Sequence, residues 1–167
     1  MDCIMKELQP PAIKIFNTPI EIGLRSLIIL EASDNQIMDI EKIMYLDYLC
    51  LNTSDIEGPT SLHAQIPNRG VQVFSKKDLI QKGLSIMLTK ELINLIVLPE
   101  GFFYQISEAG KIFLRLFQTK YFLDLLERCQ WVLSRWGNQS TQQIKSFIDD
   151  NIQNWGADFL SNESDIL

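Results

Sequence analysis

Apolar positions recur with helical periodicity in the first half of the chain and predict two helices there. The first covers about 19–32, because Thr18 can cap it and Glu21, three residues later, completes a capping box. Its apolar positions extend around most of the helix, which predicts that it is mostly buried. The second covers about 40–51 and begins after Asp39, another good capping residue.

The middle of the chain shows no sustained periodicity over residues 52–70. Loops of this length inside a compact domain are commonly functional or disordered. Residues 71–74 then alternate in the manner of a short strand. We therefore expect a long loop 52–70 that leads into a short strand.

The next segments predict a helix and then a hairpin. The helix runs from 76 to about 93 and is capped by Ser75, unless Gly83 divides it into two shorter helices. Two apolar runs, 95–98 and 102–106, flank a Pro-Glu-Gly turn. Short apolar runs on either side of such a turn are typical of a β-hairpin.

Three more helices complete the pattern. The first covers 108–117 and the second covers 120–136. The third, 141–155, begins with a capping box formed by Ser140 and Gln143 and has a narrow apolar stripe. This stripe suits either the protein's own core or a groove of a partner.

This order of elements predicts a mainly α fold with a small β-hairpin, in which residues 18–136 form a winged-helix-like domain. Residues 1–17 form an N-terminal arm, and residues 137–167 form a C-terminal helical extension with an acidic tail. The simpler alternative is that helices and a hairpin follow one another without the packing of a winged helix.

The composition is that of an ordinary globular protein. Among 167 residues, 46% are hydrophobic and 22% are charged, which excludes a wholly disordered or fibrous chain. Three separated cysteines and a single histidine form no metal-binding set, so we expect free thiols, no metal and no cofactor. The first residues lack the pattern of a signal peptide, and the longest apolar run, 27–30, is too short to span a membrane. We expect a soluble, cytoplasmic protein.

The distribution of charge bears on DNA binding. The net charge is −6, yet residues 75–136 carry nine basic and six acidic side chains. Several of their polar residues suit phosphate contacts and are candidates to face DNA: Lys76, Lys77, Lys82, Ser85, Thr89 and Lys90. The hairpin turn, however, has Glu100 and no basic residue, so a solvated helix face is the simpler interpretation.

The single histidine lies in the long loop and raises the question of catalysis. His63 is close in sequence to Ser61 and Asp55, the residue types of a hydrolase triad. There is no nucleophile elbow, no Gly-rich phosphate loop and no second histidine. We therefore expect His63 to order the loop by hydrogen bonding, and we expect no enzyme and no catalytic residue.

A set of short motifs resembles a known family. The motifs are Pro19-Ile20-Glu21-Ile22-Gly23-Leu24-Arg25, Leu46-Asp47-Tyr48-Leu49, Ser54-Asp55, Gly58-Pro59, Ser61-Leu62-His63, Pro67, Arg69 and Gly83-Leu84. Together they resemble the middle component of ABC-three-component systems, the small third subunit of the Lamassu type of bacterial anti-phage system. The resemblance covers roughly residues 17 to 136.

The resemblance implies a non-enzymatic accessory subunit in a hetero-oligomer. Its partners would be an SMC-like ATPase, on whose heads or coiled coil it would dock, and a nuclease-type effector, with DNA held nearby. The partner-docking loop would comprise Asp47, Tyr48, Asp55, Gly58, Pro59, Ser61, His63 and Arg69. Two other classes stay open: a stand-alone winged-helix transcription regulator, and a small hydrolase that uses His63.

Overall fold

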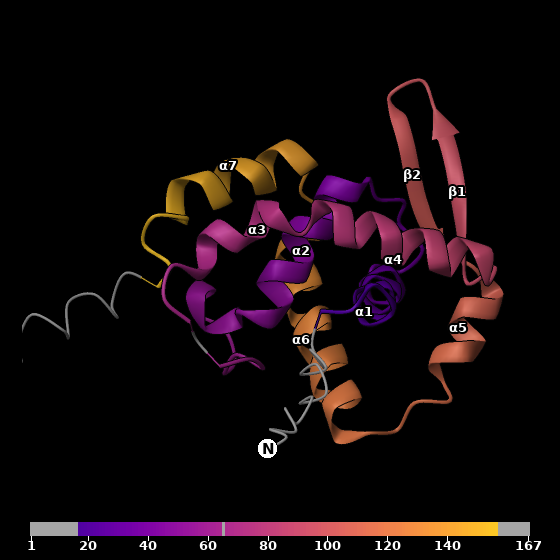
Figure 1. Cartoon of the computed structure of the whole chain (residues 1–167), viewed down its shortest axis with the longest axis horizontal. Coiled ribbons are helices and arrows are strands. Elements are labelled where there is room, and N and C mark those ends of the chain that lie inside the picture. The colour runs from indigo at the N-terminus through magenta and orange to yellow at the C-terminus, as the bar shows by residue number, and fades with distance from the viewer. Residues whose placement is uncertain (1–16, 65, 157–167) are drawn as a thin grey trace, which may run out of the picture.

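The computed structural model describes residues 17–64 and 66–156, which form a helical body with one projecting hairpin (Figure 1). Within these residues the elements are α1 (Pro19–Ala32), α2 (Ile40–Leu51), the 3-10 helices η1 (Thr53–Ile56) and η2 (Arg69–Val71), α3 (Gln72–Ser75), α4 (Lys77–Thr89), β1 (Ile93–Leu98), β2 (Gly101–Ile106), α5 (Glu108–Leu114), α6 (Lys120–Trp136) and α7 (Thr141–Asn151). The predicted mainly α fold with a small β-hairpin is confirmed. Most of the predicted N-terminal arm and the acidic tail lie outside the described residues.

Helices α1 and α2 form the centre of the core. Nearly all of α2 is buried, and so is most of α1, as its apolar sequence predicts. Asp39 caps α2 by accepting a hydrogen bond from the N–H of Lys42 at 2.7 Å. The expected capping box of α1 is only half formed, because the Glu21 carboxylate accepts from the N–H of Asn17 rather than from that of Thr18.

Helix α4 crosses α1 where two glycines meet. A Cβ built on Gly83 would lie 2.7 Å from the backbone nitrogen of Gly23, and one built on Gly23 would lie 2.8 Å from the carbonyl oxygen of Gly83. Gly83 therefore permits close helix packing and does not divide the helix. Helix α4 ends at Thr89, earlier than predicted, because Glu91 takes the left-handed conformation that turns the chain into β1.

The strand expected at residues 71–74 is wrong. These residues belong to η2 and α3, in which Val73 is buried while Val71 and Phe74 are exposed. Four residues are too few to separate alternation from a short helical turn. Nor does Ser75 cap α4, because its hydroxyl donates back to the carbonyl of Gln72.

The hairpin stands away from the helices (Figure 1). Strands β1 and β2 pair antiparallel from Ile93 opposite Ile106 to Leu98 opposite Gly101. Met38, between α1 and α2, forms a β-bridge with Tyr104 through hydrogen bonds of 2.8 and 3.0 Å between their backbone groups. This bridge ties the base of the hairpin to the helical core.

The last helices close the other side of the body. Both hydrogen bonds of the predicted capping box at Ser140 and Gln143 are present. Ile144 and Ile148 of α7 are fully buried, so this helix covers α2 with its apolar stripe. Helices α5 and α7 end about one turn before their predicted ends, at Leu114 and Asn151.

Candidate functional site

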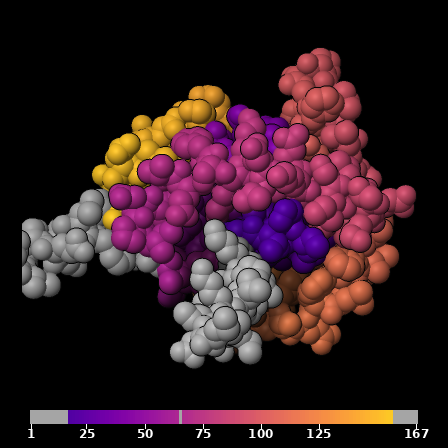
Figure 2. All heavy atoms as spheres, in the orientation of Figure 1, coloured from indigo at the N-terminus to yellow at the C-terminus, as the bar shows by residue number. Residues whose placement is uncertain are grey.

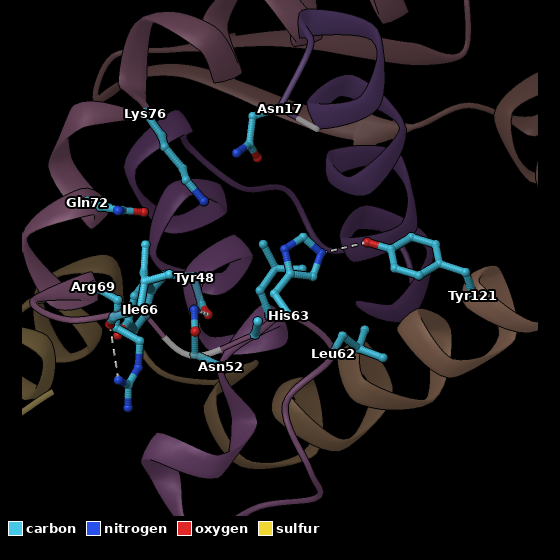
Figure 3. A pocket seen from close by; sticks show the side chains of 12 residues that line it. Asn17, Tyr48, Asn52, Leu62, His63, Ile66, Arg69, Gln72, Lys76 and Tyr121 are labelled. Carbon is cyan, nitrogen blue, oxygen red and sulfur yellow. Dashed lines mark hydrogen bonds between the residues drawn. The ribbon is translucent and has the colours of Figure 1, made fainter. Parts of the chain in front are cut away.

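The chain that follows α2 borders an open groove of about 540 Å³ (Figure 3). Tyr48, His63 and Arg69 of the predicted docking loop line it, together with Lys76 from the start of α4 and Tyr121 from α6. Segments far apart in the sequence thus meet around one hollow.

A buried ion pair lies behind Lys76, one of the residues that line this groove. The Arg25 guanidinium donates to both carboxylate oxygens of Asp47, at 2.7 and 3.2 Å, and both side chains are almost fully buried. Burial alone would raise the pKa of Asp47, but Arg25, with Lys76 at 3.8 Å, holds that pKa below its ordinary value. The same pairing outweighs the effect of burial on Arg25 and raises its pKa. Both groups are therefore charged.

A second ion pair joins the two ends of the loop, and Tyr48 of α2 binds to it. Arg69 donates through two nitrogens to the carboxylate of Asp55, at 2.9 Å from Nε. The Tyr48 hydroxyl donates to the same carboxylate at 2.9 Å, and the Tyr48 ring stacks on Trp155. Burial and the negative charge of Asp55 raise the pKa of Tyr48, so this tyrosine stays a hydrogen-bond donor.

The tight turn of the loop is closed by its own side chains. Ser54 and Ser61 exchange hydrogen bonds between each hydroxyl and the other's backbone N–H, at 3.1 and 2.9 Å. The Thr53 hydroxyl donates to the carbonyl of Pro59. Gly58 packs on Trp131, whose ring would lie 2.5 Å from an added Cβ. The Gly-Pro-x-Ser motif therefore has a clear structural role in shaping the loop.

His63 contacts the start of α6. Its Nε2 lies 3.0 Å from the Tyr121 hydroxyl, and Figure 3 shows the two side chains pointing toward one another. Burial, reinforced by the positive charges of Arg25 and Lys76, lowers the pKa of His63. The neutral imidazole thus joins the loop to α6. Within the described residues there is also no cluster of His, Cys, Asp or Glu that could hold a metal ion.

The six candidate DNA-facing residues differ in their surroundings. Lys82, Ser85, Thr89 and Lys90 lie exposed along and after α4, whereas Lys76 lines the groove. Lys77 is exposed beside α2 and pairs with Glu41 at 3.2 Å. Contact of these residues with DNA stays a prediction.

Sequence reasoning named neither Arg25 nor Tyr121 as a site residue. Arg25 carries a recognisable signal, since a charge in the middle of an otherwise apolar helix is rarely buried unless it is paired. Tyr121 has no such signal, because only the tertiary structure brings the start of α6 to the loop.

Comparison with known proteins identifies the family. The family model of the ABC-three component (ABC-3C) system Middle Component 2 matches residues 15–158, which extends the resemblance noted above through α7. Searches of curated proteins and of solved structures found no match. No helix of the described residues is long and apolar enough to cross a membrane. Since the family model covers most of the sequence, the chain belongs to the Middle Component 2 family and is a component of an ABC-three-component system.

Proposed function

We propose that this chain is a non-enzymatic accessory subunit of a bacterial anti-phage defence complex of the Lamassu type. Its partners are an SMC-like ATPase and a nuclease-type effector in the cytoplasm, and it docks on the heads or coiled coil of the ATPase. The family is that of a middle component in a three-component system, so membership supports assembly with partners that differ from this chain. The subunit thereby links DNA sensing by the ATPase to the effector.

The observation that carries this proposal is a fastened loop beside an open, partly apolar groove. Arg69 and Asp55 hold the loop with a nearly buried ion pair, so its shape exists before any partner binds. Ile66 lines the groove and is 43% exposed, and Val71, just beyond it, is 66% exposed. A preformed loop costs less ordering on binding, and exposed apolar side chains beside it supply area that a partner can bury.

We also propose that the domain is a winged helix. In chain order the elements are α1, the bridging residue Met38, α2, α4 and the hairpin β1–β2. Met38 lies between α1 and α2 and pairs with Tyr104 of β2. Helix α4 then occupies the place of a recognition helix, and its exposed Lys82 and Lys90 suit a position beside DNA held by the ATPase.

Co-purification with the ATPase and effector tests the docking surface. Ile66→Asp places a charge in the groove and Val71→Asp places one on the exposed residue before Gln72, which lines it, and we expect each variant to fold but to lose the ATPase. Leu116→Asp is the matched control, because Leu116 is 74% exposed after α5, away from the groove. The loop assignment is wrong if Asp55→Ala/His63→Ala/Arg69→Ala stays folded and still assembles fully with both partners.

The exposed polar residues of α4 favour one alternative, a stand-alone winged-helix transcription regulator. Such a protein shifts an operator probe by itself, with an affinity that falls steeply as salt rises. The net charge of −6 and the acidic Glu100 at the hairpin turn oppose binding of free DNA. A sequence-specific shift by the purified chain, lost in Lys82→Glu, would favour the regulator.

A further inference from the structure

The described chain ends at the rim of the groove. Trp155 stacks on Tyr48, which lines the groove, with the ring centroids 5.0 Å apart. A Cβ built on Gly156 would lie 2.6 Å from the nearest backbone nitrogen and 3.2 Å from the carbonyl oxygen of Ile66, another lining residue. In Figure 2 the yellow residues at the end of the described chain lie against magenta residues of the loop region. Residues 157–167, the tail segment, therefore start at this rim.

The tail segment combines negative charge with apolar side chains. It has no basic residue, and its acidic residues are Asp158, Glu163 and Asp165. Its large apolar residues are Phe159, Leu160, Ile166 and Leu167. Eleven residues can span at most about 36–40 Å when extended, which is a long reach for a groove of about 540 Å³. The segment is therefore long enough to turn back into the groove.

The groove offers complementary charge. Among the described residues that line it, the fully charged ones are Arg69 and Lys76, and none is acidic. The carboxylates that pair with them, Asp55 and Asp47, are 4% and 1% exposed and do not line the groove. Figure 3 shows the Lys76 side chain directed into the hollow. The surface that a ligand would meet is therefore basic and partly apolar.

Lys76 has room for a further carboxylate. Its Nζ lies 3.8 Å from Oδ2 of Asp47, beyond hydrogen-bond distance, and Asp47 already accepts two hydrogen bonds from Arg25. A lysine ammonium has three N–H donors, so Lys76 can bind another acidic group. Burial, and then the positive charges of Arg25 and Lys76, lower the pKa of His63, which indicates a positive potential inside the groove.

We propose that the tail segment folds back into this groove, with a carboxylate on Lys76 and an apolar side chain against Leu62 and Ile66. Because the segment is joined to the rim, its effective concentration at the groove is in the millimolar range. A contact with a Kd of about 1 mM then forms in about half of the molecules. The tail segment thus covers the groove reversibly and leaves it accessible to a competing partner.

Charge distinguishes the tail segment from the residues at the other end of the chain. The described residues begin at Asn17, which also lines the groove. Residues 1–16, however, contain two acidic and two basic side chains, so they bring no net negative charge to Lys76. The tail segment contains three acidic side chains and no basic one. Charge complementarity therefore favours the tail segment as the occupant.

The single histidine of the chain reports on the groove, because in the untagged protein the imidazole NMR signals come from His63 alone. The tail variant neutralises the acidic residues of the segment: Asp158→Asn/Glu163→Gln/Asp165→Asn. The matched control neutralises three exposed acidic residues of the hairpin and its flanks, none of which lines the groove: Glu91→Gln/Glu100→Gln/Glu108→Gln. The charged groups that already act on His63 are unchanged in both variants: Arg25, Lys76, Asp47 and Glu21.

We expect the tail variant to lower the pKa of His63, because carboxylates in the groove stabilise the charged imidazole. The control should titrate as the wild type does. Near 1 M salt, where the Debye length is about 3 Å, the difference should shrink. An unchanged titration in the tail variant overturns the proposal, and so does an equal shift in the control.

A nitroxide label separates the tail segment from other occupants. Ser161→Cys in a Cys3→Ser background carries the label in the tail segment, whereas the wild-type chain carries it at Cys3, since the two other cysteines are buried. The label at 161 should broaden the amide signals of Leu62 and Lys76, and less so in the tail variant. Broadening by the Cys3 label alone would identify residues 1–16 as the occupant. Broadening between labelled and isotope-labelled chains in a mixture would identify a second copy. Either result overturns the proposal.

Both tests use this chain alone, so they are independent of the proposed docking to an ATPase. If the ATPase binds the same groove, a tail segment that fills it half of the time lowers the apparent affinity about twofold. The tail variant should then bind the ATPase about twofold more tightly than the control variant. A lowered pKa of His63 with an unchanged affinity for the ATPase would uphold the tail contact and count against the docking surface proposed above.

Discussion

Replacing Asp47 by alanine should destabilise the protein strongly, because it leaves Arg25 charged and buried. Arg25 is 2% exposed and gives Asp47 hydrogen bonds of 2.7 and 3.2 Å. Its Nη1 has no hydrogen-bond acceptor and lies 3.6 Å from Glu21, so little compensation is available. Breaking a buried pair from one side costs about 3–5 kcal/mol. That is a large part of the about 5–15 kcal/mol that stabilises a typical domain.

Urea denaturation, followed by circular dichroism and tryptophan fluorescence, measures this loss. The melting temperature should fall by about 6–20 °C, since each kcal/mol shifts it by about 2–4 °C at this chain length. Glu41→Ala is the control: the exposed Glu41–Lys77 pair has a comparable separation of 3.2 Å, yet surface pairs contribute only about 0–1 kcal/mol.

A double variant distinguishes pairing from packing. Arg25→Met/Asp47→Leu removes both charges and keeps apolar volume, so it should be more stable than Asp47→Ala. A free energy of unfolding of Asp47→Ala within about 1 kcal/mol of wild type would contradict this expectation, and so would a double variant that is no more stable than the single one. In the wild-type protein, the depressed pKa of Asp47 means that its stabilising effect is present above pH 3.8 and is lost as pH falls further, through the folded pKa.

Three further predictions concern other parts of the molecule. Gly83→Ala should destabilise the protein by about 1–3 kcal/mol, because the added Cβ would meet the backbone of α1. Ser85→Ala, on the exposed face of the same helix, should leave the stability unchanged. Equal stability of both variants in urea would refute the close crossing of α4 and α1. The lowered pKa of His63 predicts that thermal stability falls as pH drops below 6.5, and His63→Gln should make this loss of stability smaller. A His63→Gln variant whose stability depends on pH as the wild type's does would contradict this prediction. Cys50 and Cys129 are buried, and burial raises the pKa of the Cys50 thiol. In a Cys3→Ser background, Ellman's reagent should therefore react with these thiols only after denaturation. Rapid reaction of the native protein would show that the two cysteines are not buried.

Local chemistry was sufficient to place most of the helices and the hairpin. Asp39 and Ser140 cap the helices that their positions predict, and the pair of apolar runs around Pro99 forms the expected hairpin. These features depend on neighbours within a few residues, so the sequence contains the whole signal. The error at 71–74 has the same origin, because four residues carry too little periodicity to define one structure.

The sequence by itself determined which residues of α2 and of the long loop belong to the family-like motifs, but only the tertiary structure decided which contacts they make. Asp47 and Asp55 both belong to the family-like motifs, yet nothing local indicates that one pairs with Arg25 and the other with Arg69. Their partners lie 22 and 14 residues away, and ion pairing depends on distance in space rather than on spacing along the chain. Likewise, Gly83 is a possible helix break in the sequence and a packing contact in the fold, because the helix that fills the space above it comes from far away in the chain.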